Sequence, residues 1–140
     1  MDMTAGTERL QDKQVLVTGG TTGLGLAIAE RFLREGARVV VTGRDEELGS
    51  HAQAKLAGAG QIWFVAADAG DPAALARSVD VAVGHLGALD VLVNNAGIGI
   101  EAGLLRTPLA DYNRLMDVNV RGYFLYAQAV YPHLPAAGAP

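Results

Sequence analysis

The segment 18–25 has the composition of a turn that binds phosphate groups, and it reads Thr-Gly-Gly-Thr-Thr-Gly-Leu-Gly. Because glycine has no Cβ, the main chain there can approach a ligand closely. The N–H groups at the start of a following helix, and the positive end of its dipole, favour an anion. This combination predicts a site for the pyrophosphate of a dinucleotide. The residues predicted to line it are Gly19, Thr21, Thr22, Gly23, Leu24 and Gly25.

Three shorter motifs lie farther along the chain. Asp68 follows the third apolar stretch, Asn-Asn-Ala-Gly at 94–97 follows the fourth, and Asp-Val-Asn-Val-Arg-Gly occupies 117–122 within a helical pattern. Each has an ordinary explanation when taken alone, because Asn and Gly form turns and Asn119 could face solvent. Together with the Thr-Gly-x-x-x-Gly-x-Gly spacing of 18–25, they occur in the order typical of one family. From about residue 13 to residue 134 the chain resembles the short-chain dehydrogenases/reductases.

The resemblance implies that these motifs bind a nicotinamide cofactor. Asp68, followed by Ala69, stands where the family has an acid that contacts the adenine. The segment 94–97 is similar to the family's second signature, and its members expected at the cofactor are Asn95, Ala96 and Gly97.

The residue after the second apolar stretch indicates which nicotinamide cofactor to expect. An acid there would hydrogen-bond the ribose 2′-hydroxyl of NAD and repel the 2′-phosphate of NADP. The family's acidic position matches Gly43, and Arg44 follows it with a guanidinium that can bind a phosphate. The resemblance therefore favours NADP over NAD. NAD stays open, because the acids at 45–47 could pair with Arg44 and because 21–22 lacks the base that many NADP-preferring relatives carry.

The family's chemistry is hydride transfer between the nicotinamide and a carbonyl or alcohol substrate. Asn119 takes the place of its catalytic asparagine, which helps to hold a water in a proton relay. The family also uses a serine and a Tyr-x-x-x-Lys pair, whose members share one face of a helix. No tyrosine of this chain is followed by lysine at that spacing, and Ser50 and Ser78 fall on predicted helices. We therefore expect the N-terminal, cofactor-binding half of an NAD(P)-dependent oxidoreductase.

Two other functions are compatible with a glycine-rich turn. A short paralogue could hold NADP(H) as a sensor or regulatory module without turnover. A methyltransferase also uses such loops, but Arg44 and the segment 94–97 argue against it. No metal site is predicted, since the chain has no cysteine and its three histidines are scattered singly. A Ser and a Tyr-x-x-x-Lys pair in the downstream coding sequence would favour the enzyme.

The motifs require a scaffold, and the hydropathy pattern predicts one. Apolar stretches predict strands at 15–17, 38–42, 62–66 and 91–93. Amphipathic stretches predict helices at 24–35, 45–56, 71–86 and 107–131. Unbroken apolar strands are typical of a parallel sheet covered on both faces. Right-handed crossovers then give a Rossmann-type, doubly wound α/β fold with strand order 3-2-1-4, truncated after the fourth strand and the following helix.

Length and composition limit the remaining possibilities. With 140 residues the chain fits one domain, and we expect a lead-in at 1–12, an incomplete NAD(P)-binding domain at 13–134 and an Ala/Gly/Pro tail at 135–140. The formal charge of −4, without any basic run, argues against nucleic-acid binding. The absence of cysteine fits a cytoplasmic protein, and prolines interrupt the uncharged stretch 122–140, so no membrane span is predicted. The last helix is rich in aromatic residues and commonly faces a partner subunit in the family, which favours a homo-oligomer.

Overall fold

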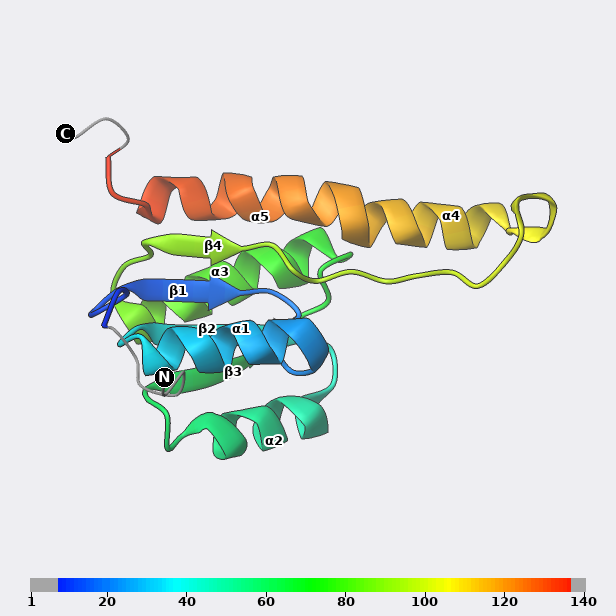
Figure 1. Ribbon diagram of the computed structural model, residues 1–140. Coiled ribbons are helices and arrows are strands. Elements are labelled where there is room, and N and C mark those ends of the chain that lie inside the picture. Colours follow the sequence, from blue (N-terminus) through cyan, green and yellow to red (C-terminus); the bar gives the residue numbers. More distant parts are fainter. Residues whose placement is uncertain (1–7, 137–140) are drawn as a thin grey trace.

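The computed structural model describes residues 8–136, so the expected lead-in at 1–12 and tail at 135–140 lie partly outside the described residues. Four parallel strands form one sheet: β1 (Gln14–Val17), β2 (Arg38–Gly43), β3 (Ile62–Ala66) and β4 (Val91–Val93). Their order is β3-β2-β1-β4, as predicted, and their bounds agree with the predicted ones to within one residue (Figure 1). The doubly wound α/β fold is therefore confirmed.

The strands are in a register that brings their carboxyl ends to one edge of the sheet. Val17, the last residue of β1, pairs with Val41 of β2 and with Val93 of β4. On the other side of β2, Val41 pairs with Phe64 of β3. Loops that leave these ends begin close together, and ligands of open α/β sheets bind at this edge.

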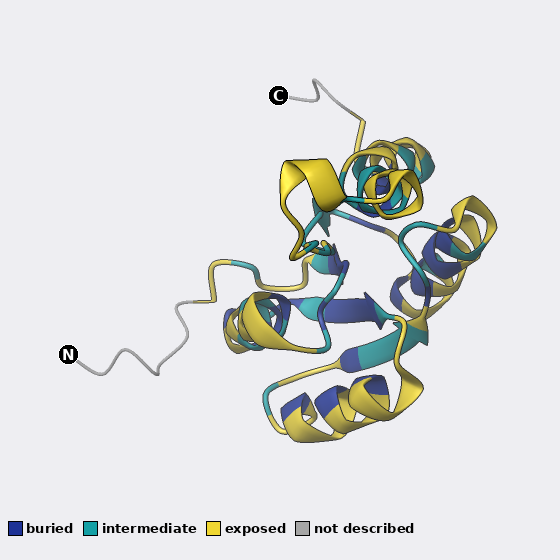
Figure 2. Cartoon of the chain, turned by 90° about the vertical axis from the view of Figure 1, so that its right-hand side faces the viewer, coloured by how far each residue is buried: buried dark blue, intermediate teal, exposed yellow. Residues whose placement is uncertain are grey.

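Helices cover both faces of the sheet, as the apolar strands predict. Helices α1 (Gly23–Arg34) and α2 (Glu46–Leu56) pack on one face, and α3 (Pro72–Leu86) and α5 (Gly122–Val130) pack on the other. Figure 2 shows their buried sides turned toward the strands. The core side chains of β1 alternate between the two layers, since Val15 and Val17 join one cluster and Leu16 joins the other.

The chain between β4 and the carboxyl end differs from the single helix predicted at 107–131. A 3₁₀ turn at Leu104–Arg106 comes first, and α4 (Leu109–Met116) starts after an extended Pro108. A π-helical turn (Asp117–Arg121) joins α4 to α5, and a 3₁₀ turn (Tyr131–His133) ends the run. Tertiary contacts explain the widened turn: Asn119 bonds the main chain at Ile98, and Gly122 packs against the Ala69 carbonyl. No helix within residues 8–136 is long and apolar enough to cross a membrane.

Candidate functional site

A cavity of about 720 Å³ lies along the carboxyl edge of the sheet. It brings together every residue predicted to bind a cofactor: Gly19, Thr21, Thr22, Gly23, Leu24, Gly25, Arg44, Asp68, Ala69, Asn95, Ala96 and Gly97. Residues that the sequence did not single out also line it, among them Ile98, Arg114 and Val118. The lining residues come from the segments at the carboxyl ends of all four strands.

The glycines of the loop 18–25 are required by close approaches and by backbone conformation. Gly19 has φ +62°, and a Cβ there would lie 2.8 Å from the Cα of Ala96. A Cβ at Gly25 would overlap the carbonyl of Gly19. Gly23 has φ +53° and no atom within 4 Å of its Cβ position. The loop therefore presents bare main chain to the cavity, as a pyrophosphate cradle requires.

A buried hydroxyl joins this loop to the end of β4. Thr18 is 0% exposed, and its Oγ1 accepts hydrogen bonds from the N–H groups of Asn95 (3.1 Å) and Ala96 (3.0 Å). In return, Nδ2 of Asn95 donates to the carbonyls of Thr18 (3.1 Å) and Gly19 (3.0 Å). Four hydrogen bonds thus fix the two cavity walls relative to each other.

The start of a helix and a cationic side chain both line the cavity. Helix α1 begins there; Thr22 at its N-cap makes no side-chain hydrogen bond to the helix, and no acidic residue occupies its first turn. The orphan N–H groups and the dipole of a helix start favour an anion. Arg44, which also lines the cavity, has no ion-pair partner among residues 8–136, so the predicted alternative of a pair with the acids at 45–47 is not formed.

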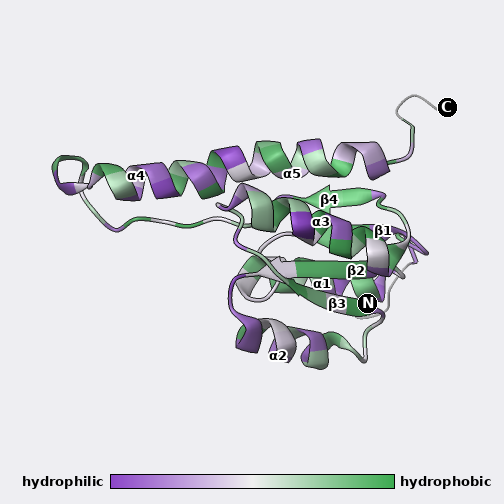
Figure 3. Cartoon of the chain, turned by 180° about the vertical axis from the view of Figure 1, so that it is seen from behind, coloured by the Kyte–Doolittle hydropathy of each residue, from purple (hydrophilic) through white to green (hydrophobic). Residues whose placement is uncertain are grey.

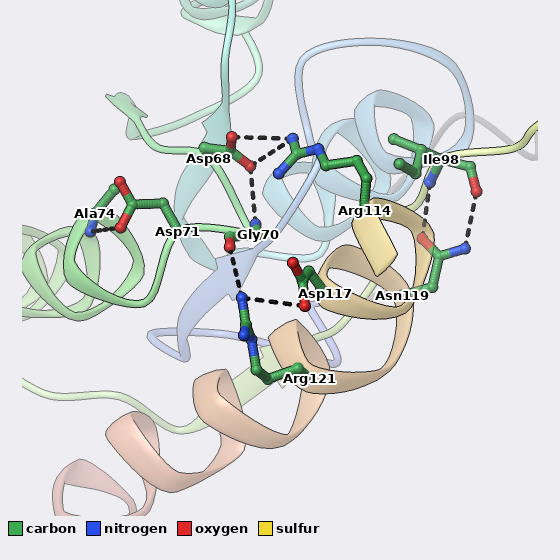
Figure 4. Close-up of polar contacts among 9 residues, drawn as sticks. All are labelled: Asp68, Gly70, Asp71, Ala74, Ile98, Arg114, Asp117, Asn119 and Arg121. Atoms are coloured by element: carbon green, nitrogen blue, oxygen red, sulfur yellow. Dashed lines mark hydrogen bonds and ion pairs between the residues drawn. The ribbon is translucent and has the colours of Figure 1, made fainter. Parts of the chain in front are cut away.

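Asp68 lies at the β3 end of the cavity and is held by α4 (Figure 4). Nη2 of Arg114 donates to both of its carboxylate oxygens at 2.9 Å, and the N–H of Gly70 donates to Oδ1 at 2.8 Å. Burial by itself raises the pKa of the Asp68 carboxyl. The bonds from Arg114 and Gly70, with the positive charges of Arg114 and Arg44, outweigh it and lower that pKa below its ordinary value. Asp68 is therefore a negatively charged acceptor at neutral pH.

Asn119 does not line the cavity but holds one of its walls. Its Oδ1 accepts from the N–H of Ile98 and its Nδ2 donates to the carbonyl of the same residue, both at 2.8 Å (Figure 4). The side chain is thus committed to the main chain after β4, and it lies in the π-helical turn. The two serines of the chain lie elsewhere: Ser50 is exposed on α2, and Ser78 is buried against Tyr126.

Two residues that shape this site were not predicted. Thr18 begins the motif at 18–25, so the sequence carried a signal for it, but its role depends on contacts with a strand far along the chain. Arg114 had no such signal, because its partner Asp68 is 46 residues away.

Comparisons with known proteins agree with this geometry. The family model described as short chain dehydrogenase matches residues 13–139. The NADP-dependent (R)-specific alcohol dehydrogenase of Lentilactobacillus kefiri is 41% identical over 118 residues, which cover 84% of this chain and 47% of that protein. The 2-(R)-hydroxypropyl-CoM dehydrogenase of Xanthobacter autotrophicus is 43% identical over 129 residues, which cover 89% and 52%.

Among solved structures, a short chain dehydrogenase from Burkholderia cenocepacia in complex with NADP superposes with a TM-score of 0.86 at 39% identity. The match covers 90% of this chain and 52% of that one. The chain spans about half the length of the curated relatives it matches. Because the family model matches most of its length, and relatives and solved structures of that family align with it, the chain belongs to the short-chain dehydrogenase/reductase family.

Proposed function

We propose that residues 13–134 form a domain that binds NADP(H) and serves as the cofactor-binding part of an oxidoreductase acting on a small carbonyl or alcohol substrate. The observation that carries the proposal is one cavity that joins the bare glycine loop, an ionised aspartate, and an arginine that has no ion-pair partner among residues 8–136. The relative from Lentilactobacillus kefiri is named as NADP-dependent, and the Burkholderia structure contains NADP, which supports the choice of cofactor.

Each part of the cofactor has a matching part of the cavity in this proposal. The pyrophosphate lies over the loop 18–25 and the start of α1, where main-chain N–H groups serve as donors. The 2′-phosphate binds the guanidinium of Arg44, and the adenine lies beside Asp68 and Ala69. A bound nicotinamide cofactor would supply or accept a hydride, and the residues after β4 would form part of the wall that holds it. There Asn95 fixes the glycine loop, and Asn119 holds the main chain at Ile98.

We further propose that these 140 residues bind the cofactor without transferring hydride. They contain no Tyr-x-x-x-Lys pair, and neither serine lies at the cavity. Asn119 has no proton to give in the accessible pH range, and among residues 8–136 no tyrosine, lysine or histidine lines the cavity. A positioned acid or base contributes about 10² to 10⁴ in rate. A second candidate function, a non-catalytic NADP(H) sensor, would share this property.

The experiment is an NMR titration of the purified chain with NADPH, followed by an assay for NADPH oxidation with a panel of ketones. We expect shifts of the amides of Gly19, Gly23 and Gly25 on binding, and no oxidation above the buffer rate. No shifts at millimolar NADPH would contradict cofactor binding. Turnover that disappears in Asn119→Ala would contradict the absence of catalysis. A longer polypeptide that adds a serine and a Tyr-x-x-x-Lys pair should oxidise NADPH with a ketone. If that polypeptide binds NADPH and shows no turnover, the result would favour the sensor function.

We propose that the chain also associates with a second copy through its last helical run. Large apolar side chains there are exposed, including Val120 (53%), Phe124 (65%) and Tyr131 (68%). Figure 3 shows the mixed hydropathy of α4 and α5. Because exposed apolar side chains on one helical run favour association, Phe124→Lys should shift sedimentation toward the monomer, while Ser50→Lys, a change of an exposed polar residue on α2 at the other face of the sheet, should not. A monomeric unmodified chain at high micromolar concentration would contradict this proposal.

A further inference from the structure

The contact between Arg114 and Asp68 leaves one defined position for a ligand. An ionised carboxylate offers about four acceptor positions, two on each oxygen. Oδ1 of Asp68 accepts from Gly70 and from Arg114, so both of its positions are used. Within residues 8–136, Oδ2 accepts only from Arg114. One acceptor position therefore remains, on Oδ2, and the Asp68 side chain is 35% exposed at the cavity.

The loop after β3 is shaped to admit the guanidinium. A Cβ at Gly70 would overlap Nη1 of Arg114 and would lie 3.0 Å from a methyl of Val118. Any other residue at position 70 would displace the arginine from the carboxylate. The contact is thus built by two separate elements, a loop that lacks a side chain at the crossing point and a helix whose arginine donates to both carboxylate oxygens through Nη2 (Figure 4).

We propose that Arg114 sets the base specificity of the site, by orienting Asp68 so that its remaining acceptor position faces a donor on the base. The inference rests on the proposed function, and it names a positioning residue that does not itself have to touch the cofactor. Adenine presents its exocyclic amino group as such a donor. Hypoxanthine has a carbonyl oxygen at the same place, which would meet the carboxylate as acceptor against acceptor. A carboxylate free to rotate would discriminate less, because it could turn away from the carbonyl.

A neighbouring arginine provides the matched control. Arg121 lies on the same helical run and contacts the same loop, through the carbonyl of Gly70 at 3.1 Å, and it pairs with Asp117 at 3.2 Å. Among residues 8–136 its hydrogen-bond and ion-pair partners are Gly70 and Asp117, and the Asp68 carboxylate is not one of them. Removing it perturbs the loop and the charge of the helix to a similar extent but leaves the orientation of Asp68 intact.

The experiment compares dissociation constants for NADP and for its deamino analogue, in which hypoxanthine replaces adenine, by NMR titration of the full chain. The unmodified chain should bind NADP about tenfold or more tightly than the analogue, as expected for one hydrogen bond to a charged group. In Arg114→Gln the ratio should fall below about threefold, and Arg121→Gln should keep the original ratio. Because each ratio compares two ligands on one protein, a general loss of affinity cancels.

Three outcomes of this experiment would contradict the inference or the proposed function. A second variant, Arg114→Lys, provides the test if Arg114→Gln does not fold. If the unmodified chain binds neither ligand, the proposed function is wrong and the inference falls with it. If it binds both equally, or if Arg114→Gln keeps the full ratio, the inference alone is overturned. Arg114→Lys retains the positive charge without the planar guanidinium, and its ratio should lie between those of the glutamine variant and the unmodified chain. NADP should still bind more tightly than NAD in the Arg114 variants, since that preference depends on Arg44.

Discussion

Replacing Thr18 with valine should destabilise the chain far more than the change in shape suggests. Valine has nearly the same volume as threonine, but a methyl group takes the place of Oγ1. Two N–H groups, those of Asn95 and Ala96, then lose their acceptor. Leaving one buried donor unsatisfied costs about 1–3 kcal/mol. Because Asn95 and Ala96 are only half-buried and water can reach them in part, we expect a total loss of about 2–4 kcal/mol.

Thr18→Ser is the matched control, because it keeps the hydroxyl and removes the methyl group. Thr18 is fully buried, so loss of the methyl should cost about 0.8 kcal/mol in transfer free energy. The assay is urea unfolding followed by circular dichroism and by the fluorescence of Trp63, the one tryptophan of the chain. Amide exchange of Asn95 and Ala96 is a second readout, and it should accelerate in the valine variant only. Equal destabilisation by valine and serine would refute the reasoning, because it would show that the hydroxyl contributes nothing.

Two further predictions concern the charged and polar contacts of the helical run. The pKa of Asp68 in the folded chain lies below its unfolded value of about 3.9, so ionised Asp68 stabilises the fold above that pH, and this contribution is lost as the pH falls through the folded pKa. In Asp68→Asn the free energy of unfolding should therefore fall less steeply with decreasing pH than in the unmodified chain. Identical pH profiles of the two proteins would contradict this prediction. Asn119→Ala removes both hydrogen bonds to Ile98, so the Ile98 amide should exchange at least tenfold faster in deuterated water, whereas unchanged protection would show that other contacts hold this wall.

The local pattern of the chain was enough to predict most of the fold. Each strand is a continuous apolar run, and each of the first three helices ends or begins at a recognisable residue: Gly36 adopts φ +91° after α1, and Asp71 caps α3 through its carboxylate. The last helical run was predicted less well. The break at Pro108 follows from local chemistry, but the π-helical turn depends on Asn119 reaching Ile98, and periodicity contains no information about that contact.

In the candidate site, too, the residues fixed by local sequence motifs were predicted and those fixed by long-range contacts were not. Every residue predicted from the glycine loop and the strand ends lines the cavity, because a parallel sheet places those ends together. Arg114 was missed because a charged residue on a helix faces solvent in most sequences, and only the tertiary structure reveals that it crosses Gly70 to reach Asp68. Long-range pairs of this kind cannot be inferred from one sequence.

The affinity of the chain for NADP compared with NAD tests the central claim most directly. The two ligands differ only in the 2′-phosphate, and Arg44 is the cavity cation without an ion-pair partner in the described part of the chain. A charge-assisted hydrogen bond to that phosphate predicts a preference for NADP of tens of fold. Arg44→Asp should reverse the preference toward NAD while the chain stays folded. Equal affinities for NADP and NAD in the unmodified chain would contradict the account.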